Sequence, residues 1–220
     1  MLTQLFEASF GALRGGWVVR APGRVNLIGE HTDYNDLPVL PMAIQREVRI
    51  VCSARTDGRV RLVNAAARFG RREFELAAEI APFERGDWGN YAKAAAQALA
   101  RERGAQRGFD AVVEGDVPPA AGLSSSSALV VACGLALAAV NEVASEPLAF
   151  AELMARGERY VGTNSGGMDQ AICLAGEAGH AAKIDFHPLR AEALPVPSDW
   201  RFLVAHSLVL ADKSGAARDA

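Results

Sequence analysis

A long apolar segment at residues 128–140 constrains the fold more than any other feature. It consists of Ala, Val, Leu, Cys and Gly and contains no charged residue. It is too short to cross a bilayer, which takes about 20 apolar residues. A helix that is apolar on every face has to be covered by protein on all sides. We therefore predict a buried core helix that starts in the serine run Ser124–Ser127 and reaches about Val143.

Strand patterns dominate the first half of the chain. We predict strands at residues 17–20, 25–28, 47–52, 59–63, 74–76, 109–114, 181–186 and 202–210. Ala21-Pro22-Gly23 is expected to form a turn between the first two strands, and Asp57-Gly58 is a hairpin signal.

Helix signals become frequent later in the chain. Asp87 is the expected N-cap of an Ala-rich helix that ends near Gly104, and Ser145 with Pro147 marks a helix reaching about Tyr160. Strands that come first and helices interleaved later predict an α+β fold with a mainly antiparallel or mixed sheet.

Bulk properties exclude several classes of protein. Half of the 220 residues are hydrophobic and 22% are charged, which is typical of a soluble globular protein. A net charge of −3 argues against a nucleic-acid partner, and no segment indicates a membrane partner. The three cysteines are widely separated, so we expect neither disulfides nor a zinc site, and a cytoplasmic location.

The first segment with chemical potential runs from Arg24 to Asn35. Glu30, His31 and Asp33 crowd around Gly29, and a pocket for a sugar needs carboxylates and an imidazole converging from one rigid turn. Arg24 is a fixed cation that could face a phosphate. On residue chemistry alone, a polar surface turn explains the same pattern.

The second segment is the loop Pro118–Leu123 with the serines that follow it. Its small residues would let phosphate oxygens approach backbone N–H groups at a helix N-terminus, which carries a partial positive charge. Simple N-capping needs one serine, whereas four occur in a row, so anion binding is favoured. The segment is neither a Walker A loop nor a nucleophile elbow.

The third segment runs from Gly162 to Gln170. Gly166 and Gly167 precede Asp169, which could accept the proton of a substrate hydroxyl or orient it beside Arg24. A capping aspartate at a helix start explains this segment equally simply.

Taken together, the three segments resemble the galactokinase family of the GHMP kinase superfamily. Arg24-Val-Asn-Leu-Ile-Gly-Glu-His-Thr-Asp-Tyr-Asn35 is similar to the family signature, Gly122-Leu-Ser-Ser-Ser126 to the phosphate loop, and Gly166-Gly-Met-Asp-Gln170 to the catalytic-aspartate segment. The resemblance covers essentially the whole chain but only the N-terminal part of a typical member.

That resemblance implies a fold and a domain organisation. The expected fold is an α+β domain like domain 2 of ribosomal protein S5, with a mixed or antiparallel sheet and helices packed on one side. Residues 1–45 would be the sugar-binding segment, and 46–220 the ATP-binding domain, truncated at its C-terminal end. The ferredoxin-like C-terminal domain of the family is expected to be absent.

The resemblance also implies roles for individual residues, with ATP and Mg²⁺ as cofactors and galactose as the substrate phosphorylated at its C1 hydroxyl. Asp169 and Arg24 would be catalytic. The sugar would be bound by Glu30, His31, Asp33 and Gly167. ATP would be bound by Ala120, Ala121, Gly122, Leu123, Ser124, Ser125 and Ser126. Ser126 and Glu158 would hold Mg²⁺.

Three departures from the family pattern bear on these expectations. Leu37-Pro38 follows Asn35-Asp36 where the family has glycine, so the rim of the sugar site should differ. Ala120 replaces the first glycine of the phosphate loop, and alanine disfavours a positive φ. Because the chain stops at Ala220, we expect weak or no activity alone and count a separate C-terminal half among its candidate partners.

Two alternatives stay open. One is a kinase for a related sugar such as N-acetylgalactosamine or arabinose. The other is a sugar sensor that binds ATP and galactose without phosphorylating the sugar.

Overall fold

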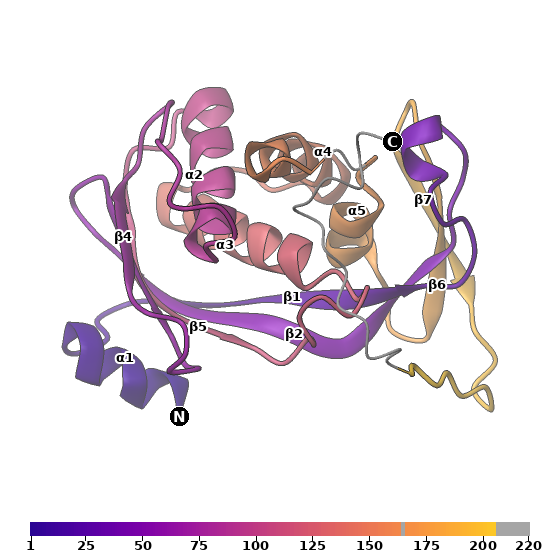
Figure 1. Cartoon of the computed structure of the whole chain (residues 1–220), viewed down its shortest axis with the longest axis horizontal. Coiled ribbons are helices and arrows are strands. Elements are labelled where there is room, and N and C mark those ends of the chain that lie inside the picture. Colours follow the sequence, from indigo (N-terminus) through magenta and orange to yellow (C-terminus); the bar gives the residue numbers. More distant parts are fainter. Residues whose placement is uncertain (164–165, 206–220) are drawn as a thin grey trace.

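The computed structural model describes residues 1–163 and 166–205 of the chain. Its centre is a five-stranded sheet with the strand order β1-β2-β5-β3-β4 (Figure 1). These strands are β1 (Trp17–Asn26), β2 (Pro41–Ala54), β3 (Arg59–Asn64), β4 (Arg72–Glu75) and β5 (Phe109–Gly115). β3 and β5 are parallel, and every other neighbouring pair is antiparallel. The predicted mixed sheet is confirmed.

β1 is one continuous strand, so the turn predicted at Ala21-Pro22-Gly23 is wrong. The pairing with β2 shifts register between Pro22 and Arg24 instead. Proline has no N–H for the ladder, and a side chain at Gly23 would lie 2.8 Å from the carbonyl oxygen of Leu123. A bulge accommodates both residues without reversing the chain.

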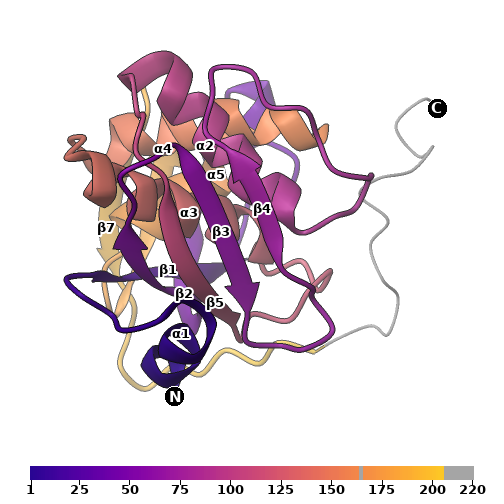
Figure 2. The same ribbon diagram turned by 90° about the vertical axis from the view of Figure 1, so that its left-hand side faces the viewer.

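The hairpin predicted at Asp57-Gly58 is also wrong, because β5 lies between β2 and β3 (Figure 2). The backbone around this turn bonds to the residue before β5: Arg55 N–H donates to Gly108 O at 3.0 Å, and Gly108 N–H donates to Asp57 O at 2.8 Å. A Cβ at Gly108 would overlap the backbone of Arg59. A long-range pairing with β5 therefore replaces the local one.

Helices cover both faces of the sheet. The helices α2 (Gly89–Arg103), α3 (Ser125–Asn141), α4 (Pro147–Glu158) and α5 (Met168–Ala175) lie on one face, and α1 (Leu2–Phe10) lies on the other (Figure 1). Among the five α-helices of the described residues, the expectation of helices on one side thus holds for four. Successive side chains of a strand point to opposite faces of the sheet, so both faces of β2 can be covered. Ile50 faces the large core, and its neighbour Val51 packs with Phe6 of α1.

The predicted core helix is confirmed as α3. Its apolar residues pack against the sheet and against α2, α4 and α5. Nine of them are at most 2% exposed: Ala128, Val130, Val131, Ala132, Cys133, Ala136, Leu137, Ala138 and Val140. Gly134 lets α4 approach closely, because a Cβ there would overlap the sulfur of Met154.

Helix ends follow the predictions in part. Gly104 ends α2 with φ 67°, as expected. α2 begins at Gly89 with Trp88 at its N-cap, but the Asp87 carboxylate still accepts a bond of 2.8 Å from Gly89 N–H. Glu146, rather than Ser145, caps α4 by accepting from the N–H groups of Leu148 and Ala149.

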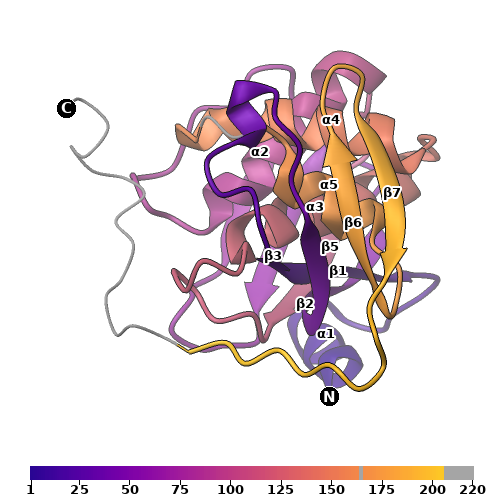
Figure 3. The same cartoon turned by 90° about the vertical axis from the view of Figure 1, so that its right-hand side faces the viewer.

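A second, two-stranded sheet stands at one end of the main sheet (Figures 1 and 3). It consists of β6 (His180–Asp185) and β7 (Arg190–Pro195), and the former confirms the strand predicted there. A β-bridge between Val39 and Ile184 joins it to the body. Of the strand predicted at 202–210, residues 202–205 are irregular and the rest lie outside the described residues. No helix in the described part of the chain is long and apolar enough to cross a membrane.

Candidate active site

The centre of the site is an ion pair between Arg24 near the end of β1 and Asp169 in the first turn of α5. Arg24 donates to Asp169 Oδ1 from both Nε and Nη2, each at 2.7 Å, and from Nη1 to Gly122 O at 2.6 Å. Both side chains are largely buried, at 11% and 14% exposure. One guanidinium therefore touches the aspartate and the phosphate-loop backbone, which are far apart in sequence.

The bulge in β1 positions Arg24. Arg24 N–H donates to Leu123 O at 3.1 Å, and the Cys173 thiol donates to Pro22 O at 2.9 Å. Burial raises the pKa of Cys173, and the negative charges of Asp169 and Glu158 raise it further, so the thiol keeps its proton. The bulge is thus held from the loop on one side and from α5 on the other.

A second carboxylate, Glu158 at the end of α4, lies close to the first. It is buried, and its Oε1 is 3.2 Å from the hydroxyl of Ser127, which also lies 3.4 Å from Asp169 Oδ2. Gln170 donates to Glu158 Oε2. Burial, followed by the charge of Glu158, raises the pKa of the nearby Tyr91 phenol. We call Arg24, Ser127, Glu158, Asp169 and Gln170 the carboxylate cluster.

The phosphate loop has the backbone of an anion site. Ala120, Gly122 and Ser124 have φ values of 54°, 72° and 58°, and alternating left-handed residues are typical of anion-binding nests. Ser124 is the N-cap of the 17-residue α3 and is 2% exposed. Its buried hydroxyl has no hydrogen-bond partner within the described structure. An unsatisfied hydroxyl at the positive end of a long helix suits a phosphate ligand.

The sequence departure at Ala120 has a structural consequence. Its left-handed conformation costs a non-glycine residue about 1–2 kcal/mol. The expectation that alanine is unfavourable at this loop position therefore agrees with the backbone.

The signature turn, Gly29–Asp36, is built by local contacts. Thr32 Oγ1 donates to Gly29 O at 2.7 Å, and Asn35 Nδ2 donates to His31 O at 2.9 Å. His31 Nδ1 lies 3.0 Å from the hydroxyl of Tyr34. From β1, Asn26 donates to Glu30 Oε1 at 3.0 Å. The imidazole and the carboxylate are exposed and oriented, as a sugar site requires.

Asp33 joins the signature turn to the segment before α5. Its Oδ2 accepts a bond of 3.0 Å from Gly166 N–H, and the contact is so close that a Cβ at Gly166 would overlap the Asp33 carbonyl. The next residue, Gly167, is the N-cap of α5 with φ 103°. The structure thus brings Asp33 against the segment that leads into α5, three residues before Asp169.

The turn closes without the glycine that the family has. Asp36 takes the left-handed conformation, with φ 60°, and Leu37 N–H donates to Thr32 O at 3.1 Å. Leu37 itself is exposed. Outside the turn, Asp36 Oδ1 lies 2.9 Å from His187 Nε2, beyond β6. The rim here is therefore formed by a leucine and a carboxylate–imidazole contact.

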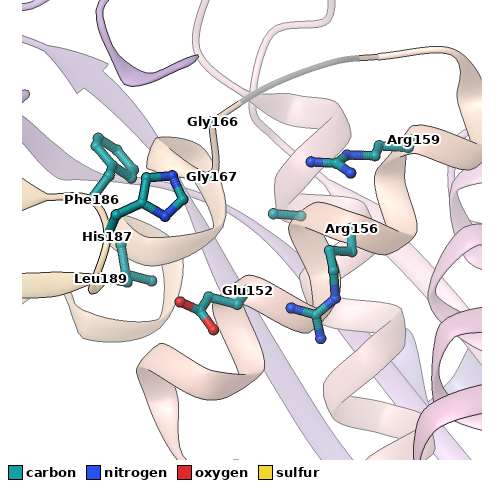
Figure 4. Close-up of a pocket in the computed structure, with 9 residues that line it drawn as sticks. Glu152, Arg156, Arg159, Gly166, Gly167, Phe186, His187 and Leu189 are labelled. Carbon is teal, nitrogen blue, oxygen red and sulfur yellow. The ribbon is translucent and has the colours of Figure 1, made fainter. Parts of the chain in front are cut away.

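Two hollows border these segments. A cavity of about 260 Å³ lies beside Gly166 and Gly167, and Figure 4 shows Arg159 of the α4 side facing His187 across it. A wider groove of about 990 Å³ runs from Ala121 and Leu123 of the phosphate loop past Met42. The loop therefore opens onto a space large enough for a nucleotide-sized ligand.

The donor atoms suit Mg²⁺ better than a transition metal. Hydroxyl and carboxylate oxygens are the ligands that Mg²⁺ takes, usually one or two from protein together with substrate phosphates. No group of three or more His, Cys, Asp or Glu residues with metal-site geometry occurs among the residues that the structure describes. The serine whose hydroxyl bonds Glu158 is Ser127, one residue beyond the predicted ligand Ser126.

Sequence reasoning missed four residues that support the site. These are Asn26, Ser127, Gln170 and Cys173. The length of the serine run was a signal for Ser127. Asn26 lies inside the signature segment and bonds Glu30 four residues away, whereas Gln170 and Cys173 bond residues 12 and 151 positions away, which composition does not reveal.

Comparisons with known proteins show which families the chain resembles. Residues 4–54 match the galactokinase galactose-binding signature, and residues 90–177 match the GHMP kinases N-terminal domain. The solved galactokinase of Lactococcus lactis, crystallised with galactose, is 35% identical with a TM-score of 0.79. The match covers 88% of this chain and 50% of that one.

More distant kinases share the fold. Mevalonate kinase of Methanococcus jannaschii is 18% identical, with a TM-score of 0.65, over 80% of this chain and 55% of its own. A D-glycero-D-manno-heptose 1-phosphate kinase from Bacteroides thetaiotaomicron is 19% identical, with a TM-score of 0.66, over 80% of this chain and 58% of its own. The chain spans about half the length of the solved relatives it matches. With the galactose-binding signature and the GHMP domain both present, the chain belongs to the galactokinase family of GHMP kinases.

Proposed function

We propose that the chain acts as a galactokinase, transferring the γ-phosphoryl group of ATP to the C1 hydroxyl of galactose. The observation that carries the proposal is the bond between Asp33 and Gly166, which sets the signature turn beside the Arg24–Asp169 pair. A sugar bound by the turn would therefore present a hydroxyl to a fixed carboxylate. Proximity of this kind accounts for much of the catalysis in phosphoryl transfer.

Asp169 and Arg24 divide the chemistry between them. Arg24 occupies Asp169 Oδ1, which leaves Oδ2 to orient the C1 hydroxyl or accept its proton. The oxygen–phosphorus bond to galactose forms as the bond between the γ-phosphorus and the bridging oxygen breaks, and ADP leaves. The guanidinium would stabilise the charge spread over the phosphoryl oxygens.

The other predicted residues would bind the sugar and the ATP phosphates. Glu30, His31, Asp33 and Gly167 would hold sugar hydroxyls. Loop residues 120–126 would wrap the ATP phosphates, with Ser124 supplying a hydroxyl that is unsatisfied in the described structure. In this proposal residues 1–45 bind the sugar, and 46–220 bind ATP.

Mg²⁺ is part of the proposal. Ser126 and Glu158 would hold it, and its charge would neutralise phosphate oxygens. Glu158 is already oriented by Ser127 and Gln170.

The test is product formation from ATP, Mg²⁺ and galactose, measured as galactose 1-phosphate by ³¹P NMR. Galactose binding is followed in parallel by calorimetry, with Asp169→Asn as control. We expect both proteins to bind galactose and the wild type alone to form product, slowly, because the chain spans about half the length of its solved relatives. If neither protein binds galactose, the proposal is wrong.

Two further outcomes separate the alternatives. Galactose binding with no product above the Asp169→Asn background would favour the sugar sensor. Faster turnover of N-acetylgalactosamine or arabinose would assign a related sugar, since a 2-acetamido group needs space that a tight pocket around C2 denies.

A further inference from the structure

Ser127 is the member of the serine run that the proposed function leaves without a role. It is the third residue of α3 and is 3% exposed. A buried hydroxyl needs a partner, and Ser127 lies inside α3, whose N-cap residue is Ser124.

The partners of Ser127 are the two carboxylates of the cluster. Its Oγ lies 3.2 Å from Glu158 Oε1 and 3.4 Å from Asp169 Oδ2. The three side chains come from α3, α4 and α5. Ser127 thus bridges two acidic residues that the helices would otherwise hold independently.

The remaining carboxylate oxygens have their own donors. Arg24 holds Asp169 Oδ1, and Gln170 holds Glu158 Oε2. Asp169 can rotate about its carboxylate axis unless Oδ2 is held as well. Ser127 is the group placed to hold it.

A hydroxyl has one proton, so Ser127 can donate to only one of the two carboxylates at a time. Resting on the proposed function, we propose that Ser127 is a positioning residue that orients Asp169 and couples it to Glu158. If Glu158 held the divalent cation of the proposed function, its Oε1 would be a weaker acceptor and Ser127 would donate to Asp169 Oδ2 instead. That bond would fix the plane of the Asp169 carboxylate and leave the second lone pair of Oδ2 for the sugar hydroxyl.

Two substitutions test this role in turnover. Ser127→Ala removes the bridge, Ser127→Thr keeps the hydroxyl, and Ser53→Ala is the control, because the Ser53 hydroxyl bonds only Gly15 O in the described structure. We expect Ser127→Ala to lower kcat about tenfold with the KM for galactose within about twofold, because a misoriented carboxylate slows chemistry more than binding. Ser127→Thr should recover most of kcat. Circular dichroism identifies any variant that fails to fold.

A second readout does not need turnover. Calorimetry gives galactose affinity with and without Mg²⁺ and a non-hydrolysable ATP analogue. In the wild type, galactose affinity should differ with and without these ligands. The ratio of the two affinities should move towards one in Ser127→Ala. A Ser127→Ala protein with the wild-type kcat and the wild-type ratio of galactose affinities would overturn the proposal.

Failure of the proposed function is distinguishable from failure of the bridge. A wild-type chain that binds no galactose contradicts the function only. Crystal structures of the wild type and Ser127→Ala then test whether Ser127 orients Asp169. If it does, the Asp169 carboxylate rotates in the variant. An unmoved Asp169 would overturn the proposal.

Discussion

The carboxylate cluster and the signature turn are assembled in opposite ways. In the cluster, Arg24 meets Asp169 across 145 residues, and Ser127 meets Glu158 across 31. In the turn, Thr32 bonds Gly29 three residues away, and Asn35 bonds His31 four residues away. The cluster is buried, whereas most of the turn is exposed.

This difference separates stability from recognition. Removing a partner from the cluster leaves a buried charge unpaired, which is costly. When a side chain is removed from the turn, water can reach the groups that it bonded and can replace those hydrogen bonds. We therefore expect substitutions in the cluster to affect folding and chemistry together, and substitutions in the turn to affect sugar binding alone.

The largest effect is expected for Asp169→Ala. It should abolish product formation, by about a thousandfold or more, because the carboxylate that orients the hydroxyl is lost. It should also lower the free energy of unfolding by about 3 kcal/mol, because the buried Arg24 loses its partner. Urea denaturation and the product assay measure the two effects.

Asp185→Ala is the matched control for this prediction. Its partner Lys183 is 3.0 Å away, and both side chains are more than 40% exposed. The free energy of unfolding should therefore fall by less than about 0.5 kcal/mol. Equal destabilisation by the two variants would remove the distinction between the cluster and a surface pair.

Asp33→Ala should give an intermediate effect, because Asp33 joins the two regions. It leaves Gly166 N–H without its acceptor and should cost about 1–2 kcal/mol of stability. Galactose affinity should fall as well, by about tenfold or more. A variant that loses stability without losing affinity would show that the junction does not shape the sugar site.

His31→Ala tests the turn by itself. Galactose affinity should fall about tenfold, the equivalent of one lost hydrogen bond to a sugar hydroxyl. Because His31 is exposed, the free energy of unfolding should change by less than about 0.5 kcal/mol. Calorimetry and urea denaturation of the same preparation measure both quantities, and Tyr34→Phe shows how much the hydrogen bond between the Tyr34 hydroxyl and His31 contributes.

Ala120→Gly should have the smallest effect. Glycine relieves the left-handed strain of about 1–2 kcal/mol, but it also gains freedom in the unfolded chain. We expect an increase in stability below about 1 kcal/mol and an affinity for an ATP analogue raised by less than about fivefold. Weaker nucleotide binding in this variant would mean that the alanine methyl contacts the nucleotide.

Local and long-range features differed in how well the sequence predicted them. The apolar run of α3, the Gly104 cap and the strand β6 follow from periodicity and residue type, and all are confirmed. The turn at Asp57-Gly58 has a hairpin signal, yet β5 inserts there. No local signal reports a partner strand that arrives some fifty residues later along the chain.

The site shows the same division. The family resemblance pointed to Arg24 and Asp169, and the structure brings them within hydrogen-bonding distance. Ser127, Gln170 and Cys173 support them through contacts that only the packing of three helices and a bulged strand creates. The length of the serine run was a signal for Ser127, but nothing in the sequence distinguished Gln170 and Cys173.

The galactose affinity of Asp169→Asn, measured by calorimetry beside that of the wild type, tests the account most directly. In the proposed function the signature turn binds the sugar and the carboxylate cluster performs the chemistry. We therefore expect the variant to bind galactose within about fivefold of the wild type. Loss of binding as large as that in His31→Ala would contradict it, because recognition would then depend on the carboxylate that was assigned to chemistry.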